Sequence, residues 1–101
     1  MGKEQIKKTL LEAIKSSKLK DSVKKASLFG SYVRKEENKE SDIDVLIEFN
    51  SDAKIGLFEF ARLQRSLGES AGRKVDLLTP DSVSKFFKEK IFREAEIIYE
   101  R

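Results

Sequence analysis

The chain has 101 residues and contains neither cysteine nor histidine. These absences exclude disulfide scaffolds, Cys/His zinc sites, thiol nucleophiles and histidine-based catalytic triads. Catalysis would have to rest on carboxylate, hydroxyl, amine or guanidinium groups, or on a metal ion held by oxygen ligands. The 21 Lys and Arg and 18 Asp and Glu are largely interleaved and leave a net charge of only +3, which argues against direct nucleic-acid binding.

The composition also bears on location and domain organisation. No stretch approaches the roughly 20 apolar residues of a membrane span. Residues 1–8 are charged and lack the apolar run of a signal peptide. We therefore expect a cytoplasmic protein without membrane contact, folded as one domain over residues 1–101.

The first third of the chain predicts a helix followed by a strand. Apolar residues recur at helical spacing over residues 4–17. Residues 26–29 form a short apolar run closed by Gly30 and Ser31, which is typical of a buried strand and a tight turn. A short helix beginning near Ser31, then a loop, would fill the polar stretch that follows. The inward-facing residues of the first helix are predicted to be Ile6, Leu10, Leu11, Ala13 and Ile14.

The middle of the chain carries the strongest strand pattern and a second amphipathic helix. Over residues 43–49, Ile43, Val45 and Ile47 share one face, while the other carries Asp42, Asp44, Leu46 and Glu48. Residues 56–71 predict a helix that ends at Gly72. The residues expected to face inward from this helix are Leu57, Phe60, Ala61 and Leu67.

The last third predicts a strand over residues 73–78 and a helix that starts near Pro80 and continues through Val83, Phe87 and Ile91. Residues 96–99 could form a final strand or the frayed end of that helix. Helices alternating with strands imply an α/β (α+β) domain, with a small sheet of three to four strands flanked by helices.

Three aspartates are the candidate catalytic residues. Asp42 and Asp44 stand two residues apart in a strand, so their carboxylates share a face. Asp76 shares that face if Val75 and Leu77 join the same core as Ile43. Such a cluster repels itself unless a cation neutralises it, and Mg²⁺ is the natural occupant because it prefers oxygen ligands. Two ions bridged by these carboxylates could support phosphoryl or nucleotidyl transfer. The alternative is a solvated strand face, with Asp76 a partner for Lys74.

A candidate phosphate-binding turn precedes the acidic pair. Gly30 lets backbone approach a phosphate closely, and Ser31 can cap the next helix or donate to a phosphate oxygen. Arg34 lies on the same helical face as Ser31 and could reach a triphosphate. An ordinary strand-to-helix turn and a solvated arginine are the competing interpretations. Lys74 is a weaker candidate of the same kind.

These segments resemble the DNA polymerase beta nucleotidyltransferase superfamily, and within it the minimal nucleotidyltransferases, or MNT-domain antitoxins. Gly-Ser followed after a spacer by Asp-x-Asp on the next strand is the shared pattern. One departure is Lys35, where members usually have Gly after the Arg. The resemblance rests on residues 28–34 (LFGSYVR), 41–47 (SDIDVLI), 72–78 (GRKVDLL) and 94–99 (EAEIIY).

The resemblance implies a single minimal nucleotidyltransferase domain with a mixed sheet, ATP as substrate, and Mg²⁺ held by Asp42, Asp44 and Asp76. Gly30 and Ser31 would hold phosphates. The implied partner is a HEPN-domain toxin ribonuclease encoded nearby, which such proteins neutralise by transferring AMP onto a tyrosine.

Two functions from different classes therefore stand. One is a nucleotidyltransferase antitoxin in which Asp76 also accepts the proton of the acceptor. The other is a binding module that neutralises its partner by docking alone. Exposed aromatics such as Phe86, Phe92 and Tyr99 would support docking. We expect these side chains instead to belong to the core of a tightly packed last helix.

Overall fold

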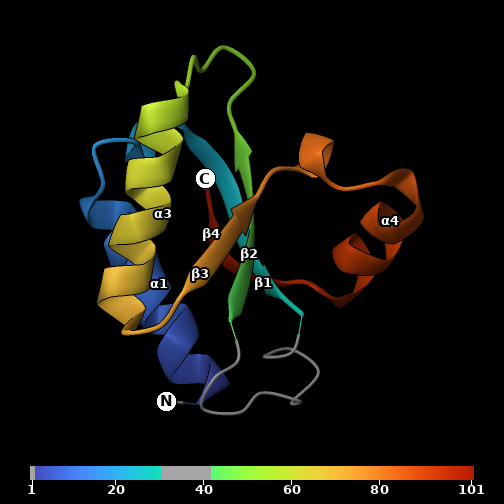
Figure 1. Cartoon of the computed structure of the whole chain (residues 1–101), viewed down its shortest axis with the longest axis horizontal. Helices are drawn as coiled ribbons and strands as arrows, with labels where there is room; N and C mark the ends of the chain where they lie inside the picture. Colours follow the sequence, from blue (N-terminus) through green and yellow to red (C-terminus); the bar gives the residue numbers. More distant parts are fainter. Residues whose placement is uncertain (1, 31–41) are drawn as a thin grey trace.

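A computed structural model describes residues 2–30 and 42–101 and shows a sheet with helices on both sides (Figure 1). Two short 3₁₀ helices, Lys20–Ser22 and Pro80–Ser82, connect larger elements. These larger elements are, in chain order, α1 (Lys3–Ser16), β1 (Val23–Phe29), β2 (Ile43–Phe49), α3 (Leu57–Ala71), β3 (Val75–Leu78), α4 (Lys85–Glu94) and β4 (Glu96–Glu100).

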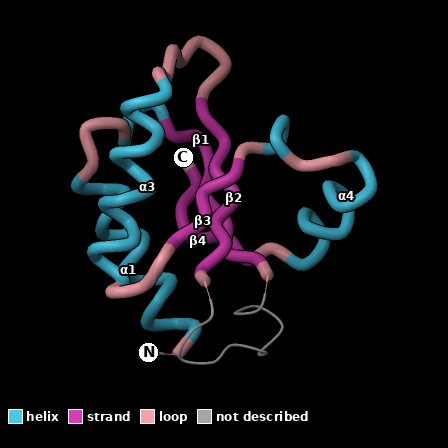
Figure 2. The backbone as a smooth tube through the Cα atoms, viewed as in Figure 1, coloured by secondary structure: helices cyan, strands magenta, loops and turns pink. Residues whose placement is uncertain are grey.

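The four strands form one mixed sheet in the order β3-β2-β1-β4. β1 runs antiparallel to both β2 and β4, while β2 and β3 are parallel. Helices α1 and α3 pack together on one face of the sheet, and α4 stands apart on the other side (Figure 2). The predicted α+β fold with a small mixed sheet is confirmed. No helix in the described part of the chain is long and apolar enough to span a membrane.

The hydrophobic core lies between the sheet and the α1–α3 layer. The stripe predicted for α1 is confirmed, because four of its five residues are buried and Leu11 packs partly buried against them. The alternation predicted for β2 is confirmed as well, with one exception on the outer face. There Leu46 is 2% exposed although its neighbours on that face are half-exposed acids. The core comprises Ile6, Leu10, Ala13, Ile14, Val23, Ala26, Leu28, Ile43, Val45, Ile47, Leu63, Leu67, Ala71, Val75, Leu77 and Ile98.

The predicted inward face of α3 is partly wrong. Leu57 is 82% exposed and Ala61 is exposed as well, whereas Leu63 and Ala71 are buried together with Leu67. The helix begins at Leu57, and in its first turn it is Phe60, not Leu57, that packs against the core, with its ring 6.4 Å from that of Phe49. The predicted stop is confirmed, since Gly72 adopts the left-handed conformation (φ 68°) that ends many helices.

The C-terminal third differs most from expectation. The helix expected from Pro80 is instead a 3₁₀ turn, and α4 starts only at Lys85, so Val83 lies outside it. The expected tightly packed last helix is wrong, because α4 buries none of its residues and Phe86 is 93% exposed. Phe92 is 41% exposed, whereas Tyr99 is partly buried against the core. Of the two readings of the C-terminus, the strand is correct.

β1 begins at Val23, three residues before the predicted strand, because its polar first half pairs with β2 and β4. The short helix expected near Ser31 lies outside the described residues. So do Ser31, Arg34 and Lys35.

Candidate active site

The three candidate carboxylates lie on the sheet face that α1 and α3 leave uncovered. Along β2, Ile43 is fully buried in the helix-side core while Asp42 and Asp44 are half-exposed. Along β3, Val75 is buried on the helix side and Asp76 is half-exposed. Because side chains alternate across a strand, this pattern places all three acids on the opposite face. That face is also the side of the sheet on which α4 stands (Figure 1).

The parallel pairing of β2 and β3 brings two of these acids side by side. Asp44 and Asp76 are direct partners across the two strands, which lie about 4.8 Å apart in a sheet. The Ile43 N–H donates a hydrogen bond of 2.9 Å to the Lys74 carbonyl and extends the pairing to the start of β2. A shift of one residue would turn one of the two carboxylates into the core, so this register is required for the pair.

Gly30 adjoins the same carboxylate from the other side. Its neighbour Phe29 pairs with Asp44 across β1 and β2, and Gly30 then turns with φ +80°. A Cβ at position 30 would lie 2.2 Å from Asp44 Oδ2. The carboxylate therefore lies against glycine backbone, in space that a side chain would occupy. This close approach gives Gly30 a physical role that a generic strand-to-helix turn does not require.

Lys74 provides a positive charge between two of the acids. Its Nζ lies 3.8 Å from Asp42 Oδ2 and 3.9 Å from Asp76 Oδ1. The Lys74 side chain is 71% exposed and the two carboxylates are about 40% exposed, so these ion pairs are solvated and weak. The position of Lys74 shows that the acidic face accommodates a cation that interacts with both carboxylates. The contact with Asp76 is the ion pair expected in the alternative interpretation of a solvated strand face.

The donor set fits a hard divalent cation. All three side chains offer carboxylate oxygens, and the chain has no histidine or cysteine to favour a softer metal. Among residues 2–30 and 42–101, no three acids stand close enough together to form a metal site as placed. Mutual repulsion between carboxylates favours this separation, and a bound divalent ion would favour their convergence. The candidate phosphate contacts Ser31 and Arg34 lie outside the described residues.

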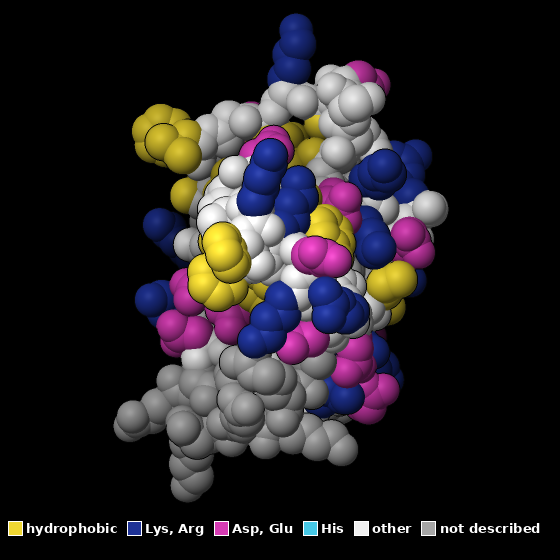
Figure 3. Space-filling model, turned by 90° about the vertical axis from the view of Figure 1, so that its right-hand side faces the viewer, with side chains coloured by type: hydrophobic (Ala, Val, Ile, Leu, Met, Phe, Trp, Pro, Cys, Tyr) yellow, Lys and Arg dark blue, Asp and Glu magenta, His cyan; other side chains and the backbone are white. Residues whose placement is uncertain are grey.

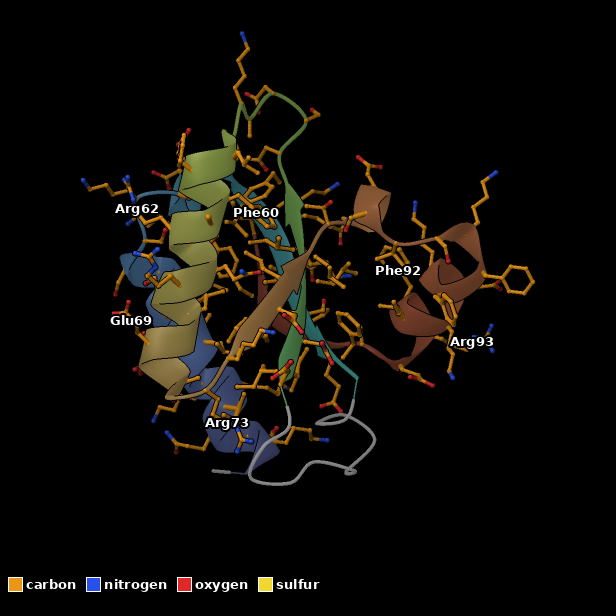
Figure 4. All side chains as sticks on the ribbon, in the orientation of Figure 1. Phe60, Arg62, Glu69, Arg73, Phe92 and Arg93 are labelled. Carbon is orange, nitrogen blue, oxygen red and sulfur yellow. The ribbon has the colours of Figure 1, made fainter. Side chains whose placement is uncertain are left out.

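Figure 4 shows the described side chains on the two sides of the sheet. Arg62 and Glu69 point outward from α3, on the far side of the helical layer from the carboxylates. Phe92 and Arg93 belong to α4, across the open face of the sheet. The acidic face of the sheet is thus the one towards α4, and α4 contributes no side chain to the hydrophobic core.

Comparisons with known proteins identify the family to which this chain belongs. The family model described as "Nucleotidyltransferase domain" matches residues 7–98. A Methanocaldococcus jannaschii protein with the name "Putative protein adenylyltransferase" is 44% identical over 76% of this chain and 81% of its own. The protein adenylyltransferase MntA of Thermococcus cleftensis is 31% identical over 90% of each chain.

Solved structures show the same fold. A minimal nucleotidyltransferase, described as putative in its name, superposes with a TM-score of 0.76 at 28% identity over 95% of both chains. A toxin–antitoxin crystal structure with AMP-PNP gives 0.76 at 17% identity, over 94% of this chain and 73% of that one. A tri-AMPylated Shewanella oneidensis HEPN toxin in complex with an MNT antitoxin gives 0.71 at 15% identity, over 98% and 73%.

The chain belongs to the nucleotidyltransferase domain family. The predicted resemblance is thereby confirmed, and the protein is a nucleotidyltransferase.

Proposed function

We propose that this nucleotidyltransferase transfers AMP from ATP to a hydroxyl of a HEPN-family toxin ribonuclease, acts in the cytoplasm, and is the antitoxin of that toxin. The observation that carries the proposal is the pairing of Asp44 with Asp76 on the open face, with Gly30 against the Asp44 carboxylate. The names of the relatives, which are protein adenylyltransferases, support the reaction. The toxin–antitoxin complexes of the same fold support the partner and the nucleotide.

The reaction forms one bond and breaks another. The acceptor hydroxyl oxygen bonds to the α-phosphorus of ATP, and the bond from that phosphorus to the β-phosphate oxygen breaks, so pyrophosphate leaves. We assign Asp76 to accept the proton of the hydroxyl, because the chain has no histidine to do so. Gly30 backbone, Ser31 and Arg34 would contact the phosphates and hold the α-phosphorus in line with the acceptor.

Asp42, Asp44 and Asp76 would hold Mg²⁺. When bound, the metal would supply positive charge for the phosphate oxygens of the donor. Lys74 interacts with Asp42 and Asp76. Its solvated ion pairs are weak enough for a divalent ion to displace.

The test is mass spectrometry of the acceptor. The chain is incubated with ATP, Mg²⁺ and the protein encoded beside it, and that protein is then weighed. We expect an adduct of one or more AMP groups, lost when Asp42→Ala and Asp44→Ala are combined. Asp52→Ala, an exposed acid in the turn after β2, is the matched control and should leave the adduct unchanged. No adduct with the wild-type chain, or an undiminished adduct with the double variant, contradicts catalysis.

A docking-only antitoxin is the second candidate, and the exposure of Phe86 on α4 is the observation that favours it. Rescue from toxicity separates the two functions. The double aspartate variant should lose rescue while still binding its partner if transfer neutralises the toxin. Retained rescue would favour docking alone.

A further inference from the structure

Helix α4 is an amphipathic element whose three phenylalanines are exposed, while Ile91 is half-buried. It contains Phe86, Phe87 and Phe92, which are 93%, 60% and 41% exposed. It buries no residue, and the hydrophobic core includes none of its side chains. A helix of ten residues is marginally stable alone in water, so packing of its exposed side against a partner would stabilise it.

Charge on α4 indicates the chemistry of the surface that would cover it. The helix carries four basic side chains and two acidic ones. Glu89 is engaged by Arg93 at 3.5 Å on the same helix, whereas Lys85 and Lys90 are exposed around Phe86. Figure 3 looks onto this side of the molecule and shows hydrophobic side chains among charged side chains of both signs. A complementary partner would therefore present an apolar pocket with an acidic rim.

The position of α4 relates this surface to the reaction. Its C-terminal end passes through Ala95 directly into β4, where Glu96 pairs with Leu28, two residues before Gly30. The helix therefore joins the sheet at the end that carries Gly30 and Asp44. It also stands on the same side of the sheet as the three carboxylates (Figure 1). A protein bound to α4 would be held beside the open face, where its hydroxyl must reach the nucleotide.

We infer that α4 is the docking surface for the acceptor protein, which contacts Phe86 and Phe87 through an apolar pocket with an acidic rim. The inference rests on the proposed function, because it identifies where the acceptor of that reaction binds. Aromatic side chains at the centre of an interface, surrounded by charges, are the usual composition of a protein–protein contact. In the free chain these rings are in water, and burying them against the acceptor supplies affinity.

The experiment uses the full chain and the purified protein encoded beside it as the acceptor. Binding is measured by calorimetry for the wild type, for Phe86→Ser combined with Phe87→Ser, and for Leu57→Ser combined with Phe58→Ser. The second pair is the matched control, since Leu57 and Phe58 are 82% and 85% exposed at the start of α3. We expect the α4 variant to weaken binding at least tenfold, with the control unchanged.

Two further measurements test the charge and the link to transfer. Lys85→Glu with Lys90→Glu should also weaken binding, and the wild-type affinity should fall as salt rises. The control is Lys18→Glu combined with Lys54→Glu, which changes two exposed lysines outside α4. This variant should bind the acceptor with the wild-type affinity. The rate of AMP transfer by the Phe86→Ser and Phe87→Ser variant should fall at low acceptor concentration. It should recover at high acceptor concentration, because the three carboxylates of the site are unchanged.

The outcomes separate docking from catalysis. Acceptor binding that needs Phe86 and Phe87 but yields no AMP adduct supports docking and contradicts the proposed transfer. AMP transfer and binding unaffected by the α4 variants overturn the docking inference and leave the transfer standing. Loss of binding only in the Leu57 and Phe58 control overturns it too. A wild-type chain that does not bind the acceptor, or that pairs with a second copy of itself through α4 in sedimentation, overturns it as well.

Discussion

Replacing Gly30 by alanine tests the geometry on which the candidate site depends. Gly30 has φ +80°, which costs a non-glycine residue about 1–2 kcal/mol. The added Cβ would also lie 2.2 Å from Asp44 Oδ2 and 3.2 Å from the Asp44 Cβ. Because Oδ2 is the end of a rotatable side chain, moving the Asp44 side chain adds only about 1 kcal/mol, the low end of typical overpacking costs. We therefore expect Gly30→Ala to lower the free energy of unfolding by about 2–3 kcal/mol and to displace the Asp44 carboxylate.

Gly72 provides a control with the same backbone demand and no steric contact. Its φ is +68°, and a Cβ there would meet nothing within 4 Å. Gly72→Ala should therefore cost only the backbone term, about 1–2 kcal/mol. The difference between the two alanine variants measures the crowding at the carboxylate.

Urea unfolding of the wild type, Gly30→Ala, Asp44→Ala and the double variant completes the test. Because Asp44→Ala removes the crowding carboxylate, alanine at position 30 should cost about 1 kcal/mol less in that background than in the wild type. Independent sites add to within about 0.5 kcal/mol. Additive losses within that limit, or equal losses for Gly30→Ala and Gly72→Ala, would refute the close approach of Gly30 to Asp44.

Three further predictions follow from individual contacts. Lys74→Met removes the ammonium beside Asp42 and Asp76. Because the two exposed ion pairs are worth about 0.2–1 kcal/mol each, the Mg²⁺ concentration that gives half of the full rise in melting temperature should fall about two- to thirtyfold. Lys18→Met should have no effect, and an unchanged midpoint for Lys74→Met would contradict competition between Lys74 and Mg²⁺. Asp76→Asn keeps the shape of the side chain but not its basicity, so the rate of AMP transfer should fall at least about 100-fold while the melting temperature is retained. A variant that transfers AMP at the wild-type rate would exclude Asp76 as the proton acceptor. The Lys3 hydrogen bond, aided by Lys7, holds the pKa of Glu96 below its ordinary value of 4.5. The ionised Glu96 therefore stabilises the fold above pH 4.5, and this stabilisation is lost as the pH falls through the lower pKa of the folded state. Glu96→Gln should accordingly flatten the acid limb of a stability–pH curve, and an unaltered slope below pH 4.5 would count against the Lys3–Glu96 pair.

Local patterns were sufficient for much of the fold and for one face of the site. The apolar stripe of α1 and the alternation along β2 depend only on the helical and strand periods, so both could be read from residue spacing. The same alternation placed Asp42 and Asp44 together on the face opposite Ile43. Gly72 likewise ended α3 as its local chemistry required.

Long-range pairing decided the rest of the site. Whether Asp76 stands beside Asp44 depends on the register of two strands about 30 residues apart, which hydrogen bonds between them determine. Only that register, together with the turn at Gly30, brings glycine backbone against the Asp44 carboxylate. Neither relation is encoded by spacing within a single element.

The exposure of the α4 aromatic side chains is a second feature that the sequence pattern could not predict. Phe86 and Phe87 have the hydrophobicity of core residues, and a sequence pattern cannot tell whether the same chain offers a surface to bury them. The helix-side core is already filled by α1 and α3, so α4 remains on the open face with its aromatic rings in water. The sequence by itself therefore determined the family and which acids share a face. The tertiary structure decided which acids are paired and which apolar surface is left for a partner, because both depend on contacts between distant segments.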